Sequence, residues 1–360
     1  EYLGDWGYFW TSTVLESNEG RVYLFAVDKN AGVSENWDEL KRGGNSIRCI
    51  LAQPGCTEDT ACNYDSGANE DDGSCEYPEQ NYNCDGDFIA TDIEGNIYQA
   101  VEIGDQVWMS ENLKTTQFNN GENIPYRSSN GDSPGYVDYD NEESNSEVYG
   151  RLYNWHAADD ERGVCPDGWH FPSDQDFMQL EMELGMLQWE TTQEDWRGDL
   201  SGVDYNVGGK LKSTTDDWAQ TNQGATNESG FTALPGGMHS DNLSFGISLT
   251  YGAFFWVGGE VDWQNGWYRQ LHYSNTTINR DYSDKNAAMS IRCVANNGCS
   301  DPLAINYDSS SLINDGSCSY APEYSGPDWH VEDGGNDVSG NGSAEYPFAS
   351  IQHALNSSSD

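Results

Sequence analysis

The sequence is poor in positive charge. It contains 16 Lys and Arg residues against 61 Asp and Glu residues, so its formal net charge is 16 − 61 = −45. This balance excludes a nucleic-acid-binding protein, because phosphate binding needs a basic face. It also argues against electrostatic docking on an anionic membrane. The acidic residues are spread along the whole chain, and we expect them to form a solvated surface, with scattered calcium ligands as the alternative.

Long apolar segments are missing as well. No run of 18 or more apolar residues occurs, so no membrane insertion is expected. Aromatic residues nevertheless make up 12 % of the chain, which argues against disorder. A phosphate-binding loop is absent, and so is a GxGxxG segment that opens a helix. The six histidines lack the HxxxH or HxH spacing of metal sites, and we expect structural roles for His156 and His170.

A short cysteine-containing repeat occurs twice. Residues 55–77 (GCTEDTACNYDSGANEDDGSCEY) match residues 298–320 (GCSDPLAINYDSSSLINDGSCSY) without a gap. Such segments are too small and polar to bury a core, so we expect disulfides to stabilise them, each by about 3 kcal/mol. A zinc site is not expected, because neither copy has a CxxC pair or a histidine.

The repeat also suggests how its cysteines pair. The second copy has Ile305 in place of Cys62, and it lacks a counterpart of Cys84, which suggests that these two cysteines are bonded to each other. The disulfides predicted from the repeat are Cys56–Cys75, Cys299–Cys318 and Cys62–Cys84. Other connectivities stay open at this point.

Aspartates of the two copies are candidate calcium ligands. They are Asp65, Asp71 and Asp72 in the first copy and Asp308 and Asp315 in the second. The spacing does not fit an EF-hand, because an alignment with Gly73 at the sixth position puts Ala68 at the first. We favour turns in which Asp and Asn cap their own backbone, with calcium as the alternative.

A second repeat is longer and partial. Residues 4–13 (GDWGYFWTST) resemble residues 250–259 (TYGAFFWVGG), and residues 45–50 (NSIRCI) resemble residues 289–294 (MSIRCV). The start of the chain therefore reads as the last third of a domain that occurs complete further on.

This repeat predicts the domain organisation. Residues 1–50 would be the C-terminal part of a truncated domain, and residues 85–296 the complete copy. In the complete copy we expect Cys165 to pair with Cys293. Cys49 is the counterpart of Cys293, so its partner would lie upstream of the sequence.

The complete copy shows many short strands and little helix, which predicts an α+β domain. Residues 92–114 alternate around EGN and GDQ turns, as a β-hairpin does. Ser173 is the expected N-cap of a helix, with Asp176 completing a loose capping box. Further strands are expected at residues 231–234, 245–249, 254–257, 268–273 and 289–294.

Motifs of the complete copy carry a family resemblance. They are, in order, IGDQVWMSENLK, YGRLYNWHAA, CPDGWHFPSDQDFMQLE, GGKLKS, NESGFTALPGGM, FFWVGG and SIRCV. Together they resemble the Fibrobacter succinogenes major paralogous domain family. The resemblance implies a C-type-lectin-like fold, related to the sulfatase-modifying and formylglycine-generating proteins. It also implies a large, secreted, multidomain bacterial protein at the cell surface.

Two further resemblances concern the flanking segments. The cysteine repeats, at residues 55–84 and 298–320, resemble spacers between domains of large secreted bacterial proteins. Residues 325–360 resemble the start of a right-handed parallel β-helix, with a short helix near the end.

The resemblance also bears on the functional site. Formylglycine-generating relatives use a cysteine pair with copper, but we expect Cys165 and Cys293 to form a structural disulfide, and we expect no cofactor. C-type lectins bind sugar through calcium with EPN or QPD and WND motifs, which are missing here. Aromatic stacking on a sugar is the remaining hypothesis, with packing in the core as the alternative. The candidate ligand-binding residues are Trp263, Trp267, Tyr268 and Arg269.

We therefore predict a non-catalytic binding or display module. Its expected partner is a neutral polysaccharide or a cell-surface protein, because the negative charge would repel acidic glycans. The alternative is part of a secreted carbohydrate-active enzyme whose catalytic β-helix lies beyond the C-terminal end of the sequence.

Overall fold

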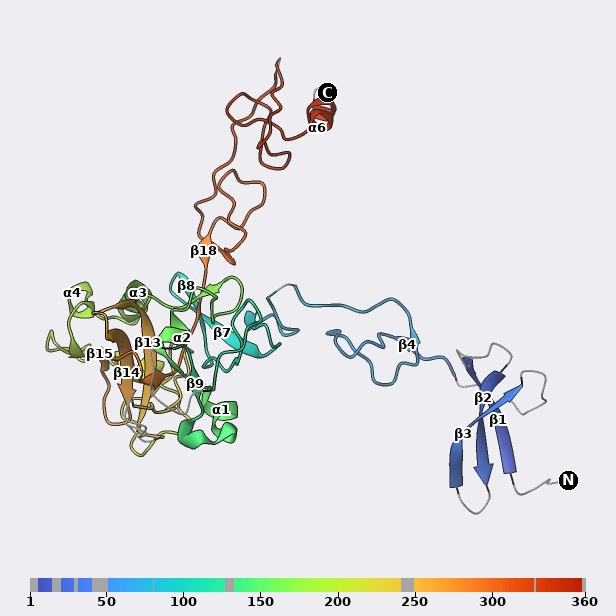
Figure 1. Cartoon of the computed structure of the whole chain (residues 1–360), viewed down its shortest axis with the longest axis horizontal. Helices are drawn as coiled ribbons and strands as arrows, with labels where there is room; N and C mark the ends of the chain where they lie inside the picture. The colour runs from blue at the N-terminus through green and yellow to red at the C-terminus, as the bar shows by residue number, and fades with distance from the viewer. Residues whose placement is uncertain are drawn as a thin grey trace. The chain divides into compact units, whose positions relative to one another are not determined.

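The computed structural model separates into two compact units, Glu1–Pro78 and Glu79–Asp360, which we describe one at a time (Figure 1). It describes the backbone of strands 6–14, 21–28 and 32–40, and residues 51–79, 81–126, 133–240, 249–326 and 328–357 in full.

The first unit begins with a three-stranded antiparallel sheet, drawn in dark blue in Figure 1. Its strand order is β1 (Trp6–Val14), β2 (Arg21–Asp28) and β3 (Gly32–Leu40). The regular pairing of β1 with β2 breaks between Trp10 and Val14.

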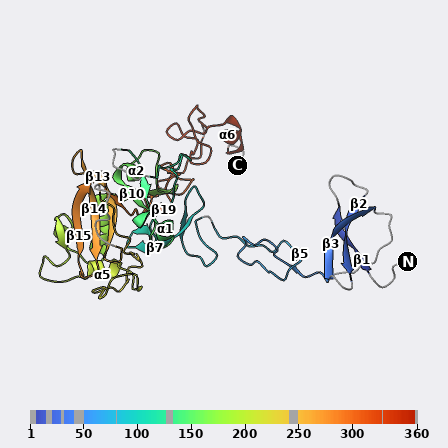
Figure 2. The ribbon, with the colours of Figure 1, turned by 60° about the horizontal axis from the view of Figure 1, so that its bottom comes forward.

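The central domain of the second unit combines several small sheets. A five-stranded sheet has the order β11 (Trp169–His170), β17 (Val294–Ala295), β8 (Gln106–Met109), β7 (Ile97–Ile103) and β6 (Ile89–Thr91). A four-stranded sheet has the order β12 (Asp195–Arg197), β15 (Ile278–Asp284), β14 (Asn265–His272) and β13 (Gly252–Glu260), of which the last three lie side by side in Figure 2. A third sheet has the order β16 (Ala288–Met289), β10 (Leu152–Asn154) and β9 (Tyr136–Val137).

Short helices connect these strands. Between residues 133 and 240 they are η1 (Tyr139–Asn141), α1 (Glu143–Tyr149), α2 (Trp155–Ala158), α3 (Asp174–Glu183), α4 (Gln188–Thr191) and α5 (Val207–Leu211). Many short strands with little helix, joined to small disulfide-bonded segments, confirm the predicted α+β class.

Strand β13 separates two hydrophobic clusters. Phe254 and Trp256 pack into one cluster, while Phe255 and Val257 pack into the other. Successive side chains of a strand point to opposite faces, so a strand buried on both faces needs an unbroken apolar run. This explains the FFWV segment, and QVWM in β8 follows the same rule, with Trp108 in the second cluster.

The backbone supports the long sequence repeat. Pairing of β13 with β14 breaks between Trp256 and Glu260, and pairing of β1 with β2 breaks between Trp10 and Val14. The first aligned segment of the repeat has the same offset, 250 − 4 = 256 − 10 = 260 − 14 = 246, so both copies have the irregularity at the same place.

Several predicted elements are confirmed. Strands β7 and β8 form the hairpin within residues 92–114. Strand β13 covers the strand predicted at 254–257, and β14 covers all but the last residue of the one predicted at 268–273. Ser173 caps α3, and its side chain and that of Asp176 form the predicted capping box.

Other strand predictions are wrong. Residues 231–234 form no strand, because Thr232 adopts a left-handed backbone conformation with φ of 53°. Residues 289–294 are split between β16 and β17, because the chain changes partners: Ser290 pairs with β13, whereas the carbonyl of Cys293 accepts from Met109 in β8. Most of the strand predicted at 245–249 lies outside the described residues.

The two spacers share one architecture. A short parallel bridge joins β4 (Pro54–Gly55) to β5 (Glu70–Asp71) in the first copy, and β18 (Asn297–Gly298) to β19 (Ile313–Asn314) in the second. Asn63 and Asn306 stabilise the two spacers in the same way. Each side chain donates a hydrogen bond to the carbonyl of a serine and accepts one from the backbone amide two residues after that serine.

The second spacer packs on the central domain. Leu312 and Ile313 contact the hydrophobic cluster that contains Trp256. Glycine is needed at position 168 for two reasons. A Cβ atom there would lie 2.6 Å from Cγ of Leu312, and the backbone φ of Gly168 is +80°, which L side chains rarely adopt. The first spacer has Asn69 and Glu70 at these two positions and lacks this apolar contact surface.

The C-terminal segment contains a parallel bridge between Val331 and Phe348, and the Phe348 ring stacks on Trp329. The predicted terminal helix is α6 (Ile351–Ser357). Among the residues that the structure describes, no helix is long and apolar enough to cross a membrane.

Candidate functional site

The cysteines form the expected scaffold. Bonded pairs are Cys56–Cys75, Cys165–Cys293 and Cys299–Cys318. Cys62 and Cys84 are also disulfide-bonded, which accounts for four disulfides, and their pairing with each other stays a prediction. Cys49 lies outside the described residues. Four disulfides indicate an oxidising, non-cytoplasmic compartment.

The five candidate calcium ligands are placed in turns. Each carboxylate accepts a hydrogen bond from the backbone amide two residues further on, and the turns of Asp71 and Asp72 overlap, since their donors are Gly73 and Ser74. The other three are Asp65, Asp308 and Asp315. These contacts are the self-capping turns that the sequence favoured. In the described part of the chain, the one cluster of three metal-ligating side chains is Glu58, Asp71 and Cys75, and the Cys75 sulfur is in a disulfide.

Arg269, a candidate ligand-binding residue, belongs to the core. Its Nε donates to Oε1 of Glu181 at 2.7 Å, and a second guanidinium nitrogen lies 2.8 Å from Asp174. Glu181 also accepts two hydrogen bonds from Arg197, at 2.6 and 2.9 Å. The side chains of Glu181, Arg197 and Arg269 are fully buried. This ion-pair network joins α3, β12 and β14 and leaves Arg269 no access to a ligand.

Trp267 and Tyr268 are also used by the fold. The Arg280 guanidinium lies 3.8 Å from the centre of the Trp267 ring, and Tyr282 packs against the edge of that ring. Tyr268 packs on the hydrophobic cluster around Phe254. Three of the four candidates, Trp267, Tyr268 and Arg269, lie within strand β14, so their side chains alternate between the two faces of a sheet.

Arg292 is an important residue that the sequence analysis did not single out. It is fully buried, and its guanidinium donates to the side chain of Asn112 and to the carbonyls of Met109, Phe231 and Thr232. Burial lowers its pKa to about 9. One side chain from SIRCV therefore holds together segments from two other family motifs, SENLK and SGFTAL.

Trp263 is the one candidate that the fold leaves exposed. Its side chain is 80 % exposed and lies at the turn between β13 and β14. Asp262 orders this turn, because its Oδ1 accepts from the backbone amides of Gln264 and Asn265, at 2.8 and 2.9 Å. The carbonyl of Gln264 accepts from the amide of Lys285 at 2.8 Å, which ties the turn to the next loop.

A small polar cavity of about 210 Å³ lies beside this ring. It is lined by His156, Trp263, Gln264, Asp284, Lys285 and Asn286. Lys285 is positioned by an ion pair with Glu260 at 2.7 Å and by the ring of Trp155, 4.4 Å from its Nζ. The site therefore combines an exposed aromatic ring with hydrogen-bonding groups on two ordered loops.

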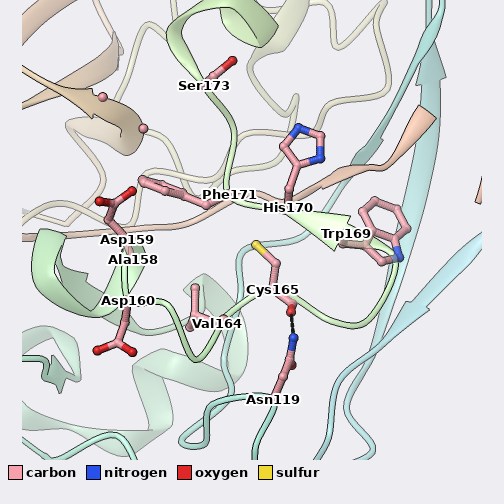
Figure 3. A pocket seen from close by; sticks show the side chains of 13 residues that line it. Asn119, Ala158, Asp159, Asp160, Val164, Cys165, Trp169, His170, Phe171 and Ser173 are labelled. Carbon is pink, nitrogen blue, oxygen red and sulfur yellow. Dashed lines mark hydrogen bonds between the residues drawn. The ribbon is translucent and has the colours of Figure 1, made fainter. Parts of the chain in front are cut away.

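A larger cavity, of about 530 Å³, opens near the Cys165–Cys293 disulfide (Figure 3). Its apolar wall includes Val164, Trp169 and Phe171, and Asp159 and His170 are among its polar groups. The CPDGWHFPS motif, residues 165–173, contributes five of the thirteen residues that line the cavity.

The polar residues near this cavity do not form a catalytic triad. Asp176 lies between Ser173 and His170: its Oδ2 is 2.6 Å from Oγ of Ser173 and 3.3 Å from Nε2 of His170. A triad instead needs histidine between the serine and the carboxylate. The sequence contains one GxSxG segment, residues 131–135. The nucleophile of an α/β-hydrolase would be followed by a helix, whereas this segment is followed by strand β9.

The Fibrobacter succinogenes major domain model matches residues 101–295. The match covers 295 − 101 + 1 = 195 of 360 residues, more than half of the chain. The chain belongs to this family. Among curated proteins and among solved structures, none matches. The C-type-lectin-like relationship of the family therefore stays a prediction.

Proposed function

We propose that the central domain is a non-catalytic binding module of a secreted cell-surface protein and that it recognises a neutral polysaccharide. The observation that carries this proposal is Trp263, an indole ring exposed at an ordered turn beside a polar cavity. Keeping so large an apolar surface in water is unfavourable, and a rigid aromatic ring offers contact area at little entropic cost.

A sugar suits both parts of this site. The apolar face of a pyranose ring can pack on the indole, while its hydroxyl groups reach Gln264, Asp284 and Asn286 in the cavity. Because the chain carries a net charge of −45, an acidic polysaccharide would be repelled, so the ligand class is neutral.

The experiment is a glycan array with the full chain and two variants. Trp263→Ala should lower binding at least about tenfold, which corresponds to about 1.4 kcal/mol, in the range of a good aromatic contact. Trp189→Ala is the matched control, because Trp189 is also exposed but lines neither cavity. Circular dichroism and thermal unfolding of all three proteins should coincide.

Equal binding by the Trp263→Ala variant and the parent would refute the site. Loss of folding in that variant would instead show that the ring packs against the domain, which its exposure contradicts. Hydrolysis of a bound glycan by the parent would refute the non-catalytic assignment.

A further inference from the structure

The larger cavity contains one carboxylate that the fold does not use. Asp160 is engaged by Arg162, whose Nε and a terminal nitrogen lie 2.7 and 2.8 Å from its two oxygens. His170 contacts Asn296 and Asp176. Asp159 differs, since among the described residues none donates a hydrogen bond to its carboxylate or forms an ion pair with it.

The surroundings of Asp159 favour a positive charge. In Figure 3 its carboxylate is turned toward the side of Phe171, whereas that of Asp160 points the other way. Asp159 is exposed where it lines the cavity, and partial desolvation together with the neighbouring Glu260 raises its pKa, although Lys285 opposes this effect. The charge of Lys285 is already paired with Glu260 at 2.7 Å. A cation in the cavity would therefore find in Asp159 a carboxylate that no described residue already pairs with.

Two segments of the chain contribute to both cavities. The segment around α2 contributes His156 to the small cavity and Asp159 to the large one. The end of β13 contributes Gly259 to the large cavity, and the turn that follows contributes Trp263 to the small one. Both cavities therefore adjoin the same two segments, which makes them candidates for two contacts of one chain-like ligand. A volume of about 530 Å³ is typical of sites that hold a small molecule or a sugar unit.

We propose that this cavity is a second subsite, which binds the protonated amine of an amino sugar through an ion pair with Asp159, beside the aromatic wall formed by Phe171. The inference rests on the proposed function, and it specifies the ligand as a polysaccharide that is neutral over most of its length and carries unacetylated amino sugars. Amines also interact favourably with aromatic rings, which suits Phe171 as a neighbour.

The test compares three small probes that differ at one position: methyl glucosaminide, methyl N-acetylglucosaminide and methyl glucoside. Their Kd values are measured by saturation-transfer NMR with the full chain at pH 7. The glucosaminide should bind about tenfold more tightly than the other two, as expected for a charge-assisted contact. Asp159→Asn should remove this preference. Asp167→Asn, an exposed carboxylate that does not line the cavity, should keep it.

Two controls separate this inference from the proposed function. Trp263→Ala should leave the preference for the glucosaminide intact while it weakens polysaccharide binding. If the preference is absent in the parent, or survives in Asp159→Asn, the subsite is refuted, and the Trp263 site still stands on its own array result. If lysine amide binds as tightly as the glucosaminide and also depends on Asp159, the cavity recognises amines of proteins, and the amino-sugar assignment is refuted.

Discussion

Removing the charge of Glu181 should strongly destabilise the central domain. Glu181 is fully buried and contacts two guanidinium groups that are fully buried as well, those of Arg197 and Arg269. In Glu181→Gln the side-chain volume is kept, but Arg197 loses its carboxylate partner. Arg269 then keeps Asp174, which it shares with Arg280 and whose side chain is 27 % exposed. Breaking a buried ion pair by removing one partner costs about 3–5 kcal/mol.

Urea unfolding followed by tryptophan fluorescence measures this loss. With a slope of about 3 kcal/mol per molar urea for a domain of this size, the midpoint should fall by about 1–1.7 M. The control is Glu143→Gln, because Glu143 lies 3.6 Å from Arg151 and is 80 % exposed, so its loss should cost about 0–0.5 kcal/mol. A loss below about 1 kcal/mol for Glu181→Gln would refute the reasoning, since the network would then contribute no more than a surface pair.

Two further predictions concern the contact between the second spacer and the domain. Leu312→Asn introduces the residue that the first spacer has at this position and removes about 1–2 kcal/mol of apolar contact. Hydrogen–deuterium exchange of residues 297–320 should therefore increase. As a control, Asn69→Asp in the first spacer should leave the exchange of residues 297–320 unchanged. The His170 ring contacts Asn296 at 2.7 Å and Asp176 at 3.3 Å. Burial lowers the pKa of the His170 imidazole, but the hydrogen bond and the charge of Asp176 outweigh burial, so the pKa is raised overall. The stabilisation of the folded domain by protonated His170 should therefore be fully present below the ordinary pKa of about 6.5 and disappear as the pH rises through the raised folded-state pKa. If the urea midpoints of the parent and of His170→Gln depend on pH in the same way, this prediction is contradicted.

The parts of the fold that follow local rules could be predicted from the sequence. The capping box at Ser173 depends on residues three apart, and the β7–β8 hairpin depends on one short turn. The disulfides of the spacers followed from comparing two copies of the same segment. Each of these features is determined within about 25 residues of chain.

The interactions that could not be predicted join distant segments. Arg292 contacts Asn112, 180 residues away in sequence, and no periodicity reveals such a pair. Glu181 did leave a signal, because it shares one face of α3 with Phe177 and Leu180, and a carboxylate on an apolar face implies a buried cation. That signal could have shown that Arg269 is structural. The aromatic character of Trp267 did not show which face of a sheet it occupies, so its contact with Arg280 could not be predicted.

The positions of the two proposed contact residues relative to the family motifs suggest how the domain divides its tasks. Asp159 directly follows YGRLYNWHAA, and Trp263 lies four residues after FFWVGG. The motifs themselves supply the core and the cavity walls, including Trp256, Trp169 and Phe171. In this arrangement the motifs hold the walls of the cavities, while residues just beyond two motifs carry the charge of Asp159 and the exposed ring of Trp263. Such a scaffold can change its ligand by single substitutions that leave the packing intact. For Asp159 and Trp263 this means that substitution should alter binding far more than stability, the opposite of what Glu181 and Arg292 should show.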